Sequence, residues 1–231
     1  NGYYNWDPYG TIQANAYGII AASESERRRD VFSGHIDLKF NIIKGLTFTS
    51  SNGVDYYNNT SYSFTPQSVN GAGKNSMGNS NLQRMLLQSS NNITYNHTWN
   101  DKHYLTVTGV WEATKSTIRN MGISGSSLQA ESVGWWDVKN AVTRDATNGY
   151  SDWALLSGVG RVIYNYDNRY MLTGTFRADG SSRFTNDKWG YFTSVAVAWT
   201  ASNESFMEST RDLISNLKIR ASYGVIGNQD I

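Results

Sequence analysis

The chain has 231 residues and a formal net charge of +1 at pH 7, so no overall field favours nucleic acid or a strongly acidic partner. Cysteine is absent, which excludes disulfides and thiolate chemistry. No run of about 18 apolar residues occurs, so the sequence predicts no transmembrane helix.

Hydrophobic residues make up 39% of the chain and aromatic residues 13%, with 15 Tyr and 8 Trp. Aromatic rings that carry a polar tip suit boundaries between apolar and wet surroundings. The chain opens at Asn1 without an initiator Met, a basic segment or an apolar leader. We therefore interpret it as a mature or excised segment that shows no signal peptide of its own.

The sequence predicts antiparallel strands in pairs. The predicted pairs are 27–40 with 46–57, 84–98 with 104–115, 153–166 with 170–179, and 189–201 with 217–225. Short polar turns at 41–45, 100–103 and 167–169 join the first three pairs, and we expect these turns on one side. The connection 202–216 predicts a short helix around 204–214, with Asn203 as its cap.

The remaining connections are predicted to be long: 58–83, 116–152 and 180–188, all rich in Asn, Ser and Gly. Short turns on one side and long loops on the other are typical of outer-membrane β-barrels. Two hairpins, around 95–106 and 164–173, also share an aromatic exit, an Asn/Asp/basic turn and an aromatic re-entry. Such rings are suited to anchoring at a membrane interface.

Segment 170–179 alternates between an apolar row, which includes Leu172 and Phe176, and a polar row, which includes Thr173 and Arg177. This period of two is the pattern of a transmembrane β-strand. The side chains expected to face lipid are Leu172, Phe176, Val195, Val197, Trp199, Leu217, Ile219 and Tyr223. Those expected to face the lumen are Thr173, Arg177, Lys218 and Arg220. The predicted fold is all-β, an antiparallel meander of about eight strands that forms part of a transmembrane β-barrel.

The sequence yields few candidates for chemistry. The three histidines lack metal-ligand spacing, and we predict no catalytic residue, no metal and no cofactor. Arg177, Asp179 and Arg183 form a charged group that is either a ligand contact or a structural cluster at a barrel rim. Trp135 and Trp136 either stack on a sugar or another flat ligand, or form a small core within their loop.

The last third of the chain closely resembles the C-terminal barrel portion of the SusC/RagA-type TonB-dependent outer-membrane transporters. The matching motifs, in order, are Arg177–Phe184, Lys188–Phe192, Ala198-Trp199, Glu204–Met207, Leu217–Gly224 and Gly227–Gln229. The first two-thirds resemble the family only in hairpin style.

The resemblance implies a plugged barrel of about 22 strands in the complete protein, located in the outer membrane. It also implies energy delivered through the TonB complex, a SusD-type lipoprotein partner, and oligosaccharide or peptide cargo. Neither a plug nor a TonB-contacting segment occurs in residues 1–231, which we interpret as a partial barrel domain. Two alternatives remain open at this point: a soluble carbohydrate-binding β-sandwich and a passive porin-like barrel.

Overall fold

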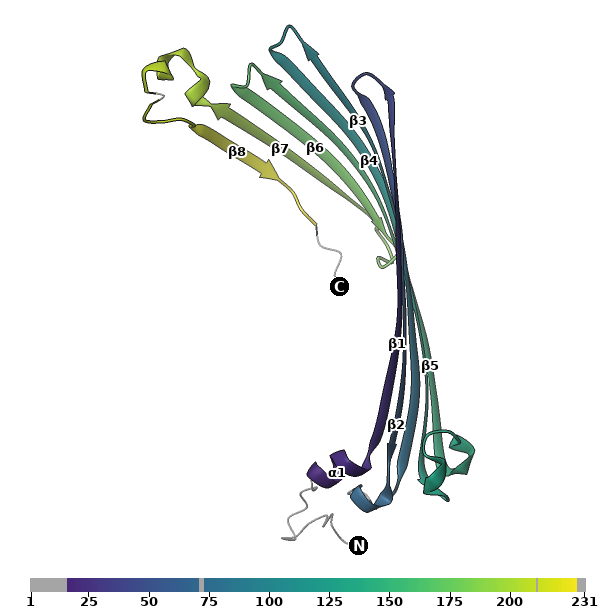
Figure 1. The fold of residues 1–231 in the computed structure, drawn as a ribbon. Helices are drawn as coiled ribbons and strands as arrows, with labels where there is room; N and C mark the ends of the chain where they lie inside the picture. The colour runs from purple at the N-terminus through teal and green to yellow at the C-terminus, as the bar shows by residue number, and fades with distance from the viewer. Residues whose placement is uncertain (1–15, 71–72, 211, 228–231) are drawn as a thin grey trace. The chain divides into compact units, whose positions relative to one another are not determined.

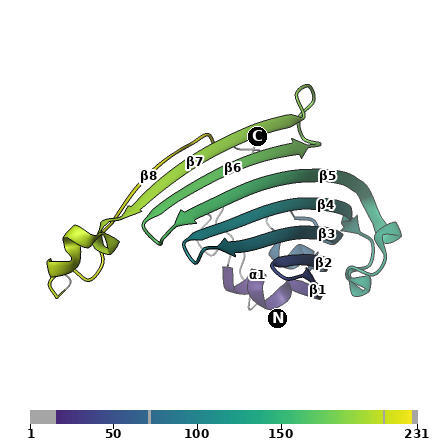
Figure 2. The ribbon, with the colours of Figure 1, turned by 90° about the horizontal axis from the view of Figure 1, so that it is seen from above.

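The computed structural model describes residues 16–70, 73–210 and 212–227. Eight strands form one sheet in the order of the chain, which confirms the predicted meander (Figure 2). The strands are β1 (Glu24–Ile43), β2 (Leu46–Thr65), β3 (Ser76–Trp99), β4 (His103–Leu128), β5 (Ala141–Tyr166), β6 (Tyr170–Ser181), β7 (Trp189–Thr200) and β8 (Lys218–Gly224). A helix that the sequence did not predict, α1 (Ala16–Ala22), precedes them. Within the described ranges, no helix is long and apolar enough to cross a membrane.

The chain divides into two compact units, and each strand from β1 to β5 contributes to both. Unit 1 comprises residues 1–33, 55–85 and 117–152, and unit 2 comprises 34–54, 86–116 and 153–231. Unit 2 therefore contains the short turns and all of β6, β7 and β8.

The three short turns lie at one end of unit 2, as the sequence predicted (Figure 1). The amide of Asn96 donates to the carbonyl of Gly45 at 2.7 Å, and the amide of Asp167 donates to the carbonyl of Lys102 at 2.6 Å. The two central residues of the second and third turns, Asn100-Asp101 and Asp167-Asn168, all have φ between 51° and 55°. Positive φ at both central positions is the geometry of a tight hairpin turn, and Asn and Asp tolerate it well.

The register of β6 to β8 separates the two predicted faces. Leu172 pairs with Val197, which in turn pairs with Ala221, and residues paired across antiparallel strands point to the same side. The predicted lipid-facing residues within the strands all lie on this face, and most are about half exposed or more; Leu217 lies just before β8, outside the pairing. Thr173, Arg177, Lys218 and Arg220 lie on the opposite face.

The predicted loops 58–83 and 116–152 are wrong in extent. β2 continues to Thr65 and β3 begins at Ser76, whereas β4 continues to Leu128 and β5 begins at Ala141. The true connections are 66–75, with the 3₁₀ turn η1 (Gln67–Val69), and 129–140, with η2 (Glu131–Val133) and η3 (Val138–Asn140). The extra strand residues carry polar side chains on both faces, so the alternation that marks a half-buried strand is missing there.

The connection between β7 and β8 also differs from its prediction. It contains the 3₁₀ segments η4 (Ala201–Asn203) and η5 (Ser205–Thr210) instead of a helix over 204–214. The Asn203 side chain caps no helix. Its amide instead donates to the carbonyl of Asn168 at 2.9 Å, which ties this connection to the turn between β5 and β6.

Candidate functional site on the polar face

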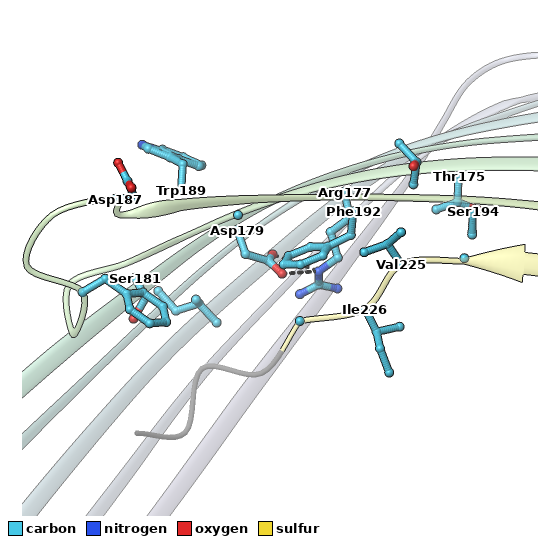
Figure 3. Close-up of a pocket in the computed structure, with 16 residues that line it drawn as sticks. Thr175, Arg177, Asp179, Ser181, Asp187, Trp189, Phe192, Ser194, Val225 and Ile226 are labelled. Carbon is cyan, nitrogen blue, oxygen red and sulfur yellow. Dashed lines mark hydrogen bonds and ion pairs between the residues drawn. The ribbon is translucent and has the colours of Figure 1, made fainter.

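A pocket of about 660 Å³ lies in unit 2 where β6, β7 and the segment after β8 come together (Figure 3). Arg177, Asp179 and Asp187 contribute its charged groups. Its apolar lining includes Phe192, Val225 and Ile226. Aromatic and aliphatic side chains around a few polar groups are typical of small-molecule sites.

Arg177 and Asp179 form an ion pair on one face of β6, because residues two apart on a strand point to the same side. The Nε atom of Arg177 lies 2.8 and 2.7 Å from the two carboxylate oxygens of Asp179 (Figure 3). A terminal guanidinium nitrogen also donates to the hydroxyl of Ser157 at 3.3 Å, and Ser157 is only 2% exposed. The charges of Arg177 and Asp179 neutralise each other, and Asp187 adds one further carboxylate to the lining. The pocket therefore suits a ligand that offers hydrogen-bond donors and an apolar surface.

Arg183 does not join this pair. Its guanidinium lies over the ring of Trp153, with 4.8 Å between Cζ and the ring centroid, which is cation–π geometry. Its backbone amide donates to the hydroxyl of Ser181 at 3.3 Å. Of the three charged residues that the sequence singled out, the structure thus brings together Arg177 and Asp179. Sequence reasoning missed Ser157 because a lone Ser within a strand carries no signal.

The two loop tryptophans, Trp135 and Trp136, lie in unit 1 and differ in how far their side chains are buried. Trp135 packs against the small core of Phe64, Met77, Leu128 and Ala141. Trp136 is 71% exposed. Tyr62 contacts both rings, with centroid distances of 6.0 Å to Trp135 and 5.8 Å to Trp136. Tyr62 was missed because its segment read as loop, whereas it lies in β2.

A further polar cluster surrounds Glu204, in the connection between β7 and β8. The indole N–H of Trp199 donates to one carboxylate oxygen at 3.0 Å, and Arg169 lies 3.4 Å from the other. A hydrogen bond from the hydroxyl of Tyr170, followed by the one from Trp199, holds the pKa of Glu204 below its ordinary value, and Arg169 acts in the same direction. Among the residues that the structure places, no three His, Cys, Asp or Glu side chains are grouped to hold a metal ion.

An antiparallel meander with one exposed apolar face and one polar face is the wall of a transmembrane β-barrel. No protein-family profile matches the sequence. Curated relatives do match it. TonB-dependent receptor P3 of Formosa agariphila is 30% identical over 240 residues, which span 100% of this chain and 24% of the receptor. TonB-dependent receptor P39 of the same organism is 31% identical over 242 residues, 100% of this chain and 22% of that receptor.

The TonB-dependent receptor SusC of Bacteroides thetaiotaomicron is 44% identical over 78 residues, 33% of this chain and 8% of SusC. Among solved structures, the RagAB peptide transporter matches with a TM-score of 0.83 and 22% identity, over 91% of this chain and 24% of the matched one. The resemblance to the SusC/RagA-type TonB-dependent receptors is confirmed, and the chain is part of an outer-membrane β-barrel of that type. It spans about a quarter of the length of the first two receptors.

Proposed function

We propose that this chain forms part of the barrel wall of an outer-membrane transporter that imports oligosaccharides in partnership with a SusD-type lipoprotein. The TonB complex would supply energy through parts of the protein outside residues 1–231. The observation that carries the proposal is the relationship to TonB-dependent receptors along the whole chain. These relatives are receptors, which favours passage and capture over catalysis.

We assign the short turns to the periplasm and the connections 66–75 and 129–140 to the cell exterior, following the asymmetry common to outer-membrane barrels. Trp136 would then be presented outward, beside Tyr62 and Trp135. Flat rings of this kind suit the apolar face of a sugar, and the Asn side chains nearby suit its hydroxyls. The pocket around Arg177 and Asp179 lies on the face assigned to the lumen and would contact cargo, or another part of the receptor, inside the barrel.

The Trp135→Ala/Trp136→Ala double variant of the full-length transporter tests the loop site. We expect reduced uptake of labelled glycans at matched membrane abundance. The single Trp136→Ala variant should give most of the loss, because Trp136 is exposed whereas Trp135 also supports the core. Trp111→Ala is the matched control, since Trp111 stacks on Phe48 in unit 2, far along the strands from the loop.

Unchanged uptake of every cargo that the wild type imports would remove the two tryptophans from the site. Loss of peptide uptake without loss of glycan uptake would replace the oligosaccharide assignment with a peptide. This second outcome is a real alternative because the RagAB structure, which shares the fold, is that of a peptide transporter.

A further inference from the structure

A continuous row of stacked rings crosses unit 2 near the short turns. His97 lies between Tyr95 and Trp99, with centroid distances of 5.9 and 5.6 Å. Trp99 stacks in turn on His103 at 5.1 Å with an interplanar angle of only 4°. His103 then contacts Tyr164 at 6.1 Å. We call these five residues the aromatic row.

The aromatic row adjoins the apolar face. Tyr164 pairs with Leu172, which pairs with Val197, so the row meets the face that carries the lipid-facing residues. Aromatic side chains gather where a barrel passes from hydrocarbon to water. Packing alone does not explain histidine at two positions of the row, because Tyr or Trp would fill the same space. Histidine differs from them in carrying two ring nitrogens.

Both histidines direct a specific nitrogen at a tyrosine. Nδ1 of His103 lies 2.7 Å from the hydroxyl of Tyr164, and Nδ1 of His97 lies 3.3 Å from that of Tyr95. When the phenol donates to Nδ1, the imidazole proton is held at Nε2. Among the described residues no polar partner lies at Nε2 of either ring, so in this tautomer each Nε2–H is available to an acceptor from outside the described residues.

An apolar hollow of about 450 Å³ lies beside the row. Tyr164 belongs to both, and Tyr170, Leu172, Val197 and Trp199 continue the lining of the hollow. Ala221, the register partner of Val197, also lines it. A small side chain at this position, where its neighbour Ile219 is large, leaves the space open.

We propose that the hollow and the aromatic row together bind one phospholipid, with an acyl chain in the hollow and the phosphate accepting a hydrogen bond from Nε2 of His103. The hollow is lined mainly by apolar surface, and the row offers ring N–H donors immediately next to it. A phospholipid has the matching arrangement, an apolar chain beside a polar headgroup. The exposed Lys102 in the adjacent turn adds a cation within the headgroup region, next to Asp101. The periplasmic leaflet is the source because the short turns are assigned to that side, which rests on the orientation proposed above.

The hollow is tested by Ala221→Phe in the full-length receptor, purified in mild detergent with phosphatidylethanolamine as the added probe. Native mass spectrometry counts the phospholipids that remain bound. We expect the wild type to retain phospholipid and Ala221→Phe to lose one molecule per receptor, because the new ring fills the hollow. Ala178→Phe makes the same change on the same face, opposite Tyr191 and outside the hollow, and should retain the wild-type number.

The headgroup contact is tested by His103→Phe, which keeps a ring on Trp99 and removes both ring nitrogens. We expect weaker retention of phosphatidylethanolamine in this variant at unchanged folding, measured by circular dichroism. The proposal is overturned if the wild type retains no phospholipid, if Ala221→Phe retains as much as the wild type, or if lipopolysaccharide occupies the hollow instead. Equal retention by His103→Phe overturns the phosphate contact. Cargo uptake is measured separately, so failure here leaves the transport proposal standing.

Discussion

At the scale of single residues, Glu204 shows how a polar side chain fixes a connection. It accepts hydrogen bonds from Tyr170 and Trp199 and faces Arg169 across 3.4 Å. Because its pKa is lowered in the folded protein, its contribution to stability is present above the ordinary carboxyl pKa and is lost as the pH falls through the lowered value. We expect Glu204→Gln in the full-length protein to be less stable at neutral pH and to lose this acid-sensitive part of its stability.

Thermal unfolding followed by circular dichroism at neutral and at acidic pH measures the effect. The difference in melting temperature between wild type and Glu204→Gln should shrink on acidification. A constant difference would show that the carboxylate charge is not what stabilises the connection. Glu24→Gln, a change of the same kind at an exposed carboxylate at the start of β1, is the control.

The two loop tryptophans differ in burial. The sequence could not show this, because adjacent Trp residues carry the same local signal and only the folded structure determines which ring is buried. Trp135 is partly buried against Leu128 and Ala141, whereas Trp136 is mostly exposed. We expect Trp135→Ala to destabilise the full-length receptor by less than the roughly 3–5 kcal/mol typical of a fully buried ring. Trp136→Ala should leave the unfolding midpoint in denaturant unchanged. Equal midpoints for the two variants would contradict the packing of Trp135.

At the scale of elements, the assignment of faces is testable by paired substitutions. Val195 lies on the apolar face opposite Gly174 and Tyr223, and Thr173 lies on the polar face opposite Ile163 and Ala196. An arginine that faces hydrocarbon near the midplane costs roughly 2–4 kcal/mol. Val195→Arg should therefore impair membrane assembly of the full-length protein, whereas Thr173→Arg should be tolerated. Equal amounts of folded receptor in outer-membrane fractions would contradict the assignment.

The elements were predictable wherever one strand face is apolar. The halves of β1 to β5 next to the turns alternate visibly, and their turns carry the Asn and Asp that positive φ requires. The halves of β2 to β5 in unit 1 were missed because polar side chains hydrogen-bond across strands there, whereas most of the unit 1 part of β1 was predicted. Asn81, for example, donates to Asn58 at 2.8 Å and to Thr60 at 2.9 Å. Such pairs stabilise a sheet without producing a hydrophobic period.

At the scale of the whole molecule, the motifs of the last third were enough to identify the receptor type, but not the pocket. Arg177 and Asp179 could be paired from their spacing in β6 alone. Their neighbours Phe192, Val225 and Ile226 come from other segments, and only the register of β6, β7 and β8 brings them together. The assignment of all of residues 1–231 to one partial barrel domain stays a prediction.

That prediction has a direct consequence for the 231-residue chain on its own. In the described sheet β1 and β8 each pair on one side only, so each leaves a row of backbone groups without sheet partners. Such edges cost several kcal/mol per unpaired group in hydrocarbon and invite pairing with other chains. We expect the isolated chain to associate through these edges, whether detergent is present or not. Size-exclusion chromatography with light scattering measures this directly. A detergent-free, well-folded monomer would contradict this expectation, because a sheet with an uncovered apolar face and two unpaired edges does not stay monomeric in water.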